Sequence, residues 1–410
     1  MPKRKPFRLL VVGVKCPPET FIRAKLEGLA REGVEVVVAS VAPYWAKKIW
    51  NLQGVRFYRL PHWEDNPIAL LFRFLADFVL LCVTAPWAIV TILLAAQSNS
   101  EKSWKAFFSK ARVYTSLARL KADIVHFEWI SAAIDYLPLF QVWKVPVTIS
   151  CRGSQINIRP LVEGNDEFRL RLATVFAKST AIHCVSEAIL REAMKYGLDP
   201  NKAWVIHPAV DPDFFHPKKQ SPNKHEFKVA TVGSVRWVKG HEYALSAIRQ
   251  LMDQGVPVRF DIIGDGPERQ RVLYTIHDLE LQNHVRLLGR LNPEQVRDRL
   301  QQSDVFLLSS LSEGISNAVL EAMSCGLPVV TTDCGGMREA VTDGVEGFIV
   351  PVRDPEAMAQ ALLRLWKEPD LRKKMGEAAR ERVLREFRLD QQISAFLALF
   401  ESVVGSSANR

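Results

Sequence analysis

Residues 304–351 read DVFLLSSLSEGISNAVLEAMSCGLPVVTTDCGGMREAVTDGVEGFIVP, and this stretch decides the fold. The apolar run at 305–309 predicts a buried strand, and a loop and a short helix follow it. We expect Gly326 to end that helix in the left-handed conformation that glycine adopts without strain. A second apolar run at 329–332 then begins the same cycle. Strand, loop and helix in alternation predict an α/β fold with a parallel sheet.

The loops at the carboxyl ends of such strands are the places where parallel sheets bind ligands. The first of these loops holds Glu313 and leads into the helix that carries Glu321. Two carboxylates placed in this way can accept hydrogen bonds from a sugar and a ribose on either side of a diphosphate. The helix start presents backbone N–H groups and the positive end of the helix dipole, which suit a phosphate. The residues expected there are Gly314, Ile315, Ser316 and Asn317.

Either glutamate alone could be structural, because Glu313 suits a helix N-terminus and Glu321 suits a solvated helix face. The whole pattern is more specific than the pair. Residues 313–321 (EGISNAVLE) resemble the E-x7-E signature of the retaining glycosyltransferases of family 4. The A-x-G-x-P-V-V sequel of that family is matched at 323–330, and its G-G-x-x-E at 335–339. The resemblance implies the α/β fold named GT-B, with two facing Rossmann-like domains and a cleft between them.

Length and composition allow this architecture. A chain of 410 residues with 48% hydrophobic and 24% charged residues is globular and has room for two cores. With the resemblance, we expect an acceptor-binding domain over 1–210, joined by a C-terminal helix at 390–404. A nucleotide-sugar-binding domain is expected over 217–388. The polar stretch 217–226 (PKKQSPNKHE), which contains two prolines, is the predicted boundary.

The charge is distributed unevenly along the chain. Residues 1–210 hold 28 Lys and Arg against 17 Asp and Glu, a net charge of +11, whereas the remainder carries −2. Nucleic acid and anionic lipid are the usual partners of such a basic half. No nucleic-acid-binding motif accompanies the charge, so we expect a membrane surface and no nucleic acid as partner.

Cysteine usage and the amino-terminal residues bear on the compartment. The six cysteines form no C-x-x-C pair, which argues against a disulfide framework or a zinc site and for a reducing compartment. The apolar run at 7–14 is too short for the core of a signal peptide. We therefore expect a cytoplasmic protein that is peripheral at the cytoplasmic face of the membrane.

Residues 78–96 (FVLLCVTAPWAIVTILLAA) contain no charge and are long enough to cross a bilayer. Pro86 lies in their middle, and the strands expected on both sides belong to one domain, which argues against a span. The aromatic and basic segment 104–112 that follows suits the membrane interface. We expect a segment that lies in this interface. Helices buried in the protein or in an acceptor groove, and a true span, are the alternatives.

The acceptor side is predicted from three places in the N-terminal half. Glu19 and Thr20 lie in a segment that resembles the family's S-E-T-F-I, where the loop and helix face the acceptor. The strand predicted at 122–128 ends with His126 and Glu128, again at a carboxyl edge. His126 is the candidate for a polar role near the acceptor, although a lone histidine at a strand end is often structural.

The third place is the loop after the strand predicted at 145–150, which holds Arg152 and Gly153. The family usually has H-G-x-D here, and Arg152 stands where its histidine would be and Gln155 where its aspartate would be. An arginine stays protonated and cannot act as a general base. It can still pair with an anionic acceptor or with a leaving phosphate.

A diphosphate cradle is predicted at 233–240 (GSVRWVKG), between a strand at 227–232 and a helix. Glycines and cations in that position supply backbone N–H groups and positive charge to phosphates. The spacing is neither a P-loop nor G-x-G-x-x-G, so nucleotide hydrolysis and NAD binding lose support. It resembles the family's V-G-R-L-x-x-x-K-G, with Lys239 at the lysine, Ser234 in place of the arginine and Arg236 as a substitute. The glycines expected on the donor side are Gly233, Gly264 and Gly289.

We therefore expect retaining transfer of a sugar from a UDP-, GDP- or ADP-sugar to a glycan or lipid-linked acceptor, in cell-surface polysaccharide or glycolipid synthesis. Lys239 and Arg236 would stabilise the leaving diphosphate, Glu313 would hold the donor sugar and Glu321 the ribose. No carboxylate is placed to attack from the opposite face, so same-face attack assisted by the leaving phosphate is expected. Residues 211–213 spell D-x-D in the linker, but we expect no metal and no cofactor.

Three alternatives stay open. One is a GT-B epimerase or phosphorylase. Another is a non-catalytic GT-B relative that acts as a membrane-assembly scaffold, which the departures at Arg152, Gln155 and Ser234 leave open. The third is a nucleic-acid-binding protein.

Overall fold

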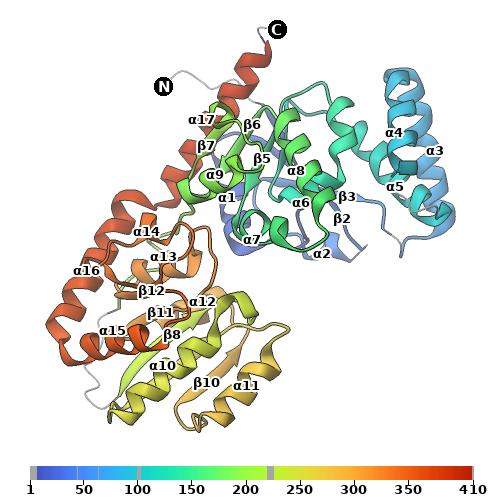
Figure 1. Cartoon of the computed structure of the whole chain (residues 1–410). Coiled ribbons are helices and arrows are strands. Elements are labelled where there is room, and N and C mark those ends of the chain that lie inside the picture. The colour runs from blue at the N-terminus through green and yellow to red at the C-terminus, as the bar shows by residue number, and fades with distance from the viewer. Residues whose placement is uncertain (1–6, 44, 63, 99–102, 219–225, 409–410) are drawn as a thin grey trace. The chain divides into compact units, whose positions relative to one another are not determined.

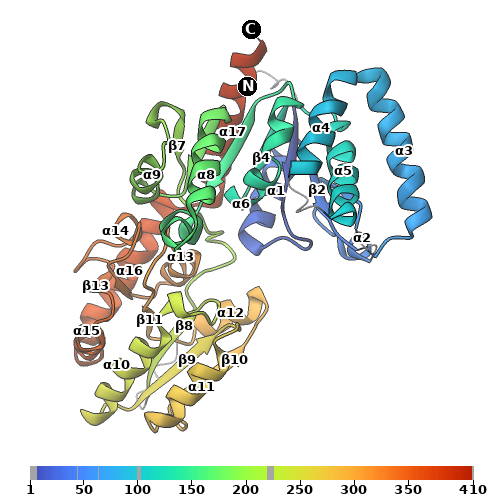
Figure 2. The same cartoon turned by 45° about the vertical axis from the view of Figure 1, so that its right-hand side comes forward.

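The computed structural model describes residues 7–43, 45–62, 64–98, 103–218 and 226–408. Its internal contacts divide the chain into two compact units. Unit 1 comprises Met1–Cys184, Leu190–Ile206 and Ile393–Arg410, and unit 2 comprises Val185–Ile189 and His207–Gln392. Each unit is a parallel sheet with helices packed on it (Figures 1 and 2). Within the boundary predicted at 217–226, residues 219–225 lie outside the described part of the chain.

The sheet of unit 1 has seven parallel strands in the order β3-β2-β1-β4-β5-β6-β7. Its strands are β1 (Arg8–Val12), β2 (Glu35–Val41), β3 (Val55–Leu60), β4 (Ile124–Phe127), β5 (Val147–Cys151), β6 (Ala181–Cys184) and β7 (Ala203–Val205). The apolar run at 181–186 (AIHCVS) predicts from the sequence the last strand of this sheet, but that prediction is wrong, because β7 pairs beside it. Only three residues long, β7 is too short to give a periodic signal.

The helices of unit 1 include two that share residues with unit 2, α9 and α17. They are α1 (Thr20–Arg31), α2 (Ala46–Ile49), α3 (Pro67–Thr84), α4 (Pro86–Ser98), α5 (Trp104–Ala118), α6 (Ile130–Asp135), α7 (Gly153–Asn157), α8 (Asp166–Lys178), α9 (Glu187–Met194) and α17 (Leu389–Ala408). Residues 393–410 of α17 belong to unit 1. The sequence predicts Ser186 as the cap of the helix that follows it. This is confirmed, since the Ile189 N–H at the start of α9 donates to Ser186 Oγ at 3.1 Å.

The apolar stretch 78–96 is not one segment, and this corrects the sequence-based expectation. The helix α3 begins eleven residues earlier, at Pro67, and ends at Thr84, and α4 begins at Pro86. A proline disfavours helical geometry in the residue before it, and Ala85 has φ −154° and ψ 63°. Among the described residues, α3 alone is long and apolar enough to cross a membrane, by length and composition.

The sheet of unit 2 has six parallel strands in the order β10-β9-β8-β11-β12-β13. They are β8 (Phe227–Val232), β9 (Val258–Ile263), β10 (Val285–Gly289), β11 (Val305–Leu308), β12 (Val329–Thr332) and β13 (Gly347–Val350). The order reverses between β8 and β11, which are direct neighbours. The helices are α10 (His241–Asp253), α11 (Arg269–Asp278), α12 (Pro293–Leu300), α13 (Asn317–Ser324), α14 (Met337–Ala340), α15 (Pro355–Lys367) and α16 (Pro369–Glu386).

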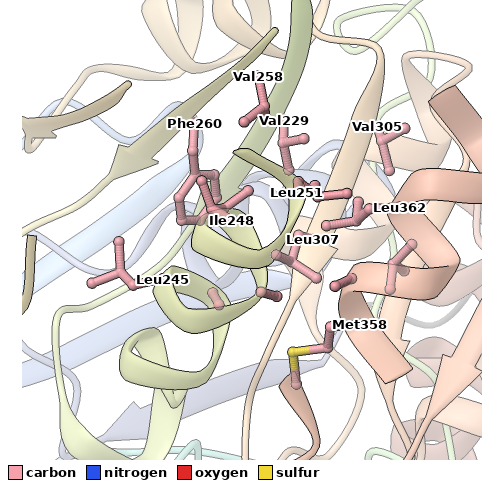
Figure 3. Close-up of a cluster of buried hydrophobic side chains, with 14 of the residues drawn as sticks. Val229, Leu245, Ile248, Leu251, Val258, Phe260, Val305, Leu307, Met358 and Leu362 are labelled. Atoms are coloured by element: carbon pink, nitrogen blue, oxygen red, sulfur yellow. The ribbon is translucent and has the colours of Figure 1, made fainter. Parts of the chain in front are cut away.

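Alternation along β11 supplies both cores of unit 2. Val305 and Leu307 enter the core on one face of the sheet, and Phe306 and Leu308 enter the core on the other. All four side chains are buried, as in a central parallel strand covered on both faces. Each such side chain stabilises the fold by about 1.5–3 kcal/mol through burial. Figure 3 shows the first core, where side chains of the sheet meet those of α10 and α15.

Candidate functional site

The loops after β8 and β11 meet where the strand order of unit 2 reverses, the usual ligand position in open α/β sheets. The Leu311 N–H donates to the Val238 carbonyl at 2.8 Å, and Ser309 Oγ donates to the Lys239 carbonyl at 2.9 Å. Gly240 makes this approach possible. It has φ +58°, and a Cβ there would lie 2.3 Å from the Ser309 carbonyl oxygen.

This contact brings together two of the three residues predicted to act in catalysis, whereas the third, Arg236, is exposed. Lys239 Nζ lies 2.5 Å from Glu313 Oε1, and both side chains are largely shielded from solvent. Ser310 Oγ donates to the same carboxylate oxygen at 2.7 Å. The pair is a charge-assisted hydrogen bond that holds the lysine at the edge of the sheet. If a bound diphosphate replaced Glu313 as the partner of Lys239, the Glu313 carboxylate could accept hydrogen bonds from sugar hydroxyls.

The loop after β12 supports the Glu313 loop from the other side. The Gly336 N–H donates to the Gly314 carbonyl at 2.6 Å. Gly335 has φ +56°, and a Cβ there would lie 1.8 Å from the Glu313 carbonyl oxygen. The Gly335-Gly336 pair therefore allows the two loops to approach closely through their backbones, in addition to forming its turn.

Glu321 is a half-buried carboxylate on α13. In the part of the chain that the structure describes, no cation or hydrogen-bond donor contacts its side chain. Burial raises the pKa of Glu321 to about 7 because the ionised form loses hydration. A group of this kind gains most from a ligand that donates hydrogen bonds to it.

The start of α13 is not closed by its own side chains. Ser316 precedes the helix and makes no side-chain cap, and Asn317 Oδ1 is buried without a hydrogen-bond partner. Ile315 is buried in the second core of unit 2, so it can meet a ligand only through its backbone. An uncapped helix start retains unsatisfied N–H groups and a positive dipole end.

The other residues predicted on the donor side lie at ends of neighbouring strands. Gly264 has φ +147°, and its N–H donates to the Gly289 carbonyl at 2.9 Å. A Cβ on Gly264 would lie 1.7 Å from the Gly233 carbonyl oxygen. Ser234 and Arg236 are exposed. The structure thus places Gly233, Gly264 and Gly289 side by side, with Arg236 in the loop that holds Lys239.

Two residues near these loops were not assigned a role from the sequence. His241 begins α10 and is buried, and burial together with the Lys239 charge lowers its pKa to about 4. Its imidazole is therefore neutral at neutral pH. The only feature of the sequence that pointed to His241 was its position directly after the predicted diphosphate cradle at 233–240.

Glu339 is the second. Its carboxylate accepts from the N–H groups of Glu187 (2.8 Å) and Ala188 (2.9 Å) and lies 3.1 Å from His207 Nε2. Burial acts to raise the pKa of Glu339, but His207 and the two N–H groups hold it below its ordinary value. The G-G-x-x-E pattern contained this residue without showing what it binds.

Among the residues predicted for the acceptor side and their neighbours, three charged residues of unit 1 form one largely buried network. Lys25 on α1 pairs with Glu128, which follows β4, and Arg152 after β5 lies 3.0 Å from the same carboxylate. Burial acts to raise the pKa of Glu128, but Lys25, His126 and Arg152 hold it well below its usual range. The Arg152 guanidinium also lies 4.9 Å from the centre of the Phe21 ring. Arg152 is therefore fixed by Glu128 and an aromatic ring, which sequence reasoning did not anticipate.

His126 lies 3.6 Å from Glu128 and also makes a second set of buried contacts. Its Nδ1 lies 2.9 Å from Thr148 Oγ1 and its Nε2 lies 3.2 Å from Ser150 Oγ, which in turn lies 2.8 Å from His183 Nδ1. Burial lowers the pKa of His126. This surrounding describes a neutral histidine that connects neighbouring strands.

The remaining predicted acceptor residues lie at helix starts. Thr20 begins α1 directly after Glu19, whose Oε2 is buried without a hydrogen-bond partner. Gly153 begins α7 with φ +23°. Gln155 accepts from the Ser131 N–H at 3.1 Å and donates to Ser131 Oγ, so it connects α7 to α6.

The D-x-D sequence at 211–213 has a local role in its turn. Asp211 Oδ1 accepts from the N–H groups of Asp213 (3.0 Å) and Phe214 (3.3 Å). An aspartate that hydrogen-bonds the backbone two residues later stabilises a turn.

Comparison with known proteins adds the class to this geometry. The model of the family described as glycosyl transferases group 1 matches residues 213–382, and that of glycosyltransferase family 4 matches residues 90–214. The amylovoran biosynthesis glycosyltransferase AmsK of Erwinia amylovora is 28% identical over 364 residues, which cover 85% of this chain and 87% of that protein. The putative colanic acid biosynthesis glycosyltransferase WcaL of Escherichia coli K12 is 31% identical over 226 residues, covering 53% of this chain and 55% of that protein.

Solved structures agree on the fold. A glycosyltransferase from Rickettsia africae has a TM-score of 0.72 at 18% identity and covers 98% of this chain and 99% of its own. Sucrose-phosphate synthase from Thermosynechococcus elongatus has a TM-score of 0.78 at 18% identity, over 98% of this chain and all of its own. Together with the two parallel-sheet units, these neighbours confirm the predicted GT-B fold. The chain belongs to the group 1 glycosyltransferases of family 4.

Proposed function

We propose that this glycosyltransferase moves a sugar from a nucleotide-diphosphate sugar to a glycan or lipid-linked acceptor, with retention at the anomeric carbon. One observation carries the proposal. Lys239 and Glu313 meet at the point where the strand order of unit 2 reverses, beside the unpartnered Glu321 and the uncapped start of α13. An Anabaena protein of the same fold is described in complex with UDP and glucose, which supports a uridine nucleotide as the first donor to test.

Each residue then has a chemical role. Lys239, the exposed Arg236 and the N–H groups at the start of α13 stabilise the charge that develops on the leaving diphosphate. Glu313 accepts from the donor sugar hydroxyls, and Glu321 accepts from the ribose. The acceptor oxygen bonds to the anomeric carbon as the bond to the diphosphate breaks, and the acceptor proton passes to the leaving phosphate. This set of cations and dipoles needs no metal, so a metal-independent reaction stays part of the proposal.

The setting belongs to the same proposal. Relatives named for amylovoran and colanic acid biosynthesis support a role in cell-surface polysaccharide synthesis, or in glycolipid synthesis. The basic N-terminal half supports a location at the cytoplasmic face of a membrane.

The test is a thermal-shift panel of UDP-, GDP- and ADP-sugars on the wild type, Glu321→Ala and the control Glu377→Ala. Glu377 is an exposed glutamate on α16. A donor present at about 100 times its dissociation constant stabilises the folded state by roughly 2.7 kcal/mol. We expect one nucleotide class to shift the wild type and the control but not Glu321→Ala. If no donor shifts the wild type, the chain is a non-catalytic relative.

Retention is tested separately. The anomeric configuration of the product, read by NMR before it equilibrates, should match that of the donor. An inverted product would contradict the same-face mechanism.

A further inference from the structure

The helix α3 carries its charges toward the protein. Arg73 donates to Tyr58 Oη at 3.2 Å and to the Arg59 carbonyl at 3.0 Å. Asp77 is fully buried, pairs with Arg119 and accepts from Ser116 Oγ at 2.7 Å. These are the only charged residues of α3, so the side of the helix that faces away from unit 1 has none.

That outward side is instead apolar along its whole length. Its residues on α3 recur at spacings of three and four, and the same character continues on α4, which contains no charged residue between Pro86 and Ser98. All of them are between 42% and 79% exposed. We call this set the outer face: Ile68, Phe72, Leu75, Val79, Val83, Trp87, Val90 and Leu94.

The polarity of α3 is therefore the reverse of that of a water-facing helix, which buries its apolar side and exposes its charged side. The opposite side of α3 holds Leu70, Asp77 and Leu81, which are buried. Figures 1 and 2 both show α3 as the outermost helix of this part of unit 1. An exposed apolar patch of this extent marks a contact with a membrane or a protein.

Charge at the borders of the outer face favours lipid as the occupant. The helix α5 begins with Trp104 and Lys105, both exposed, and between 103 and 118 its charged residues are all basic. Lys144 Nζ lies 4.4 Å from the centre of the Trp87 ring. Tryptophan and lysine at the edge of an apolar surface suit the headgroup region of an anionic bilayer.

The surrounding topology decides how deep this contact goes. The strands β3 and β4, which precede and follow the three helices, belong to one sheet, so a crossing by α3 would require a second crossing back. The helix α4 has 13 residues, a length of about 20 Å, against a hydrocarbon thickness of about 30 Å. It cannot make the return.

We propose that the outer face of α3 and α4 inserts into one leaflet of an anionic bilayer, parallel to its surface, with the start of α5 at the headgroups. The inference gives a defined surface to the membrane location proposed above and rests on that proposed function for its purpose, which is access to a lipid-linked acceptor.

The first test is flotation of the full chain with phosphatidylcholine vesicles that contain about 30 mol% phosphatidylglycerol. We expect the wild type to float with the vesicles. The fraction of the double variant Phe72→Glu/Val79→Glu that floats should be about tenfold lower, because two charges would have to enter the hydrocarbon. The matched control is Leu170→Glu/Tyr274→Glu, which changes the charge equally at side chains that are 70% and 69% exposed on α8 and α11. It should float like the wild type.

Depth is measured at a native cysteine. Cys82 is exposed on α3, whereas Cys151, Cys184, Cys325 and Cys334 are buried and Cys16 is half-buried. An environment-sensitive dye on Cys82 should shift to the blue on vesicle binding and be quenched by lipids that carry a spin label within the same leaflet. Quenching only from the bilayer centre would overturn the parallel arrangement.

Two results would overturn the proposal as a whole. In the first, the wild type does not float with the vesicles, and on gel filtration the variant Phe72→Glu/Val79→Glu has half the apparent mass of the wild type. The outer face would then be the interface between two copies of the chain. The other is equal loss of flotation in the control.

The variant Glu321→Ala keeps this test separate from that of the proposed function. It should float and lose the donor shift. If the wild type does not float but still shows the donor shift, only the membrane surface is rejected. If it floats but shows no donor shift, only the donor site is rejected.

Discussion

Glu321 keeps a proton at a pH where an ordinary glutamate has lost it, and this makes its free energy depend on pH. Its pKa of about 7 in the folded chain stands against 4.5 for an ordinary glutamate. Between pH 4.5 and 7 the unfolded chain loses the proton while the folded chain keeps it, so stability falls as pH rises through this window. Above pH 7 the full cost is present, as much as about 3 kcal/mol.

The substitution Glu321→Gln removes that cost. We expect the variant to be more stable than the wild type at pH 8 by up to about 3 kcal/mol, and by less than about 1 kcal/mol at pH 5. Urea unfolding at the two pH values measures this, with Glu377→Gln as the exposed control. A difference that is the same at both pH values would contradict a half-buried carboxylate whose pKa is raised.

Gly335 gives a second prediction, with a control of nearly the same backbone. Gly335 and Gly344 both have positive φ, +56° and +79°, but a Cβ at Gly335 would meet the Glu313 carbonyl oxygen whereas nothing lies within 4 Å at Gly344. Gly344→Ala should cost about 1–2 kcal/mol from the left-handed conformation. Gly335→Ala should cost about 1–3 kcal/mol more and should also abolish the donor shift. Equal effects in urea unfolding would show that the loop yields to the clash.

At the residue scale, the sequence was enough to predict which residues belong to the candidate site, but only some of the contacts that they make. Lys239 lies in one strand-loop-helix unit, and Glu313 and Glu321 share another, so local spacing was enough to predict all three. The ion pair between Glu128 and Arg152 was not predicted. It also involves Lys25 on α1, which pairs with the same carboxylate and lies far away in the sequence.

At the scale of elements, the buried ion pair between Lys25 and Glu128 joins α1 to the end of β4, and Arg152 extends it to β5. Lys25→Met leaves the carboxylate buried with less compensation, and we expect a loss of about 3–5 kcal/mol. The control is Lys373→Met, whose partner Glu377 is 3.9 Å away on an exposed face of α16 and which should change stability by less than about 1 kcal/mol. Urea unfolding followed by circular dichroism measures both. A Lys25→Met variant as stable as the control would mean that Arg152 alone satisfies Glu128.

The elements themselves were predicted where periodicity was strong. The strands at 227–232 and 329–332 have the bounds expected for them. The strand β3 carries arginines among its apolar residues and lies at the edge of its sheet, so it gave no such signal. The bounds of α3 were misjudged because the prediction followed the uncharged run from 78 onward, whereas the helix begins at Pro67 and includes Arg73 and Asp77.

At the scale of the molecule, the last helix completes a core that begins nearly 400 residues earlier. Phe396 on α17 is fully buried, its ring centre lies 4.7 Å from that of His183, and Lys25 Nζ lies 4.2 Å from it. Phe396→Ala should cost about 3–5 kcal/mol, and the loss should fall on unit 1. Scanning calorimetry with donor present should show a lowered transition for unit 1 and an unchanged one for unit 2.

The control for this prediction is Leu384→Ala on α16, a partly exposed residue of unit 2. It should leave the unit 1 transition in place. A single transition that falls with Phe396→Ala and rises with donor would show that the two units unfold together.

The reversed polarity of α3 changes what concentration means for this enzyme. A chain held by its outer face at a bilayer searches for an acceptor in two dimensions, so the rate should follow the mole fraction of acceptor in the leaflet and not its amount per volume. Adding acceptor-free vesicles at constant total acceptor should then slow the reaction by dilution within the surface, although every bulk concentration of protein, donor and acceptor stays the same.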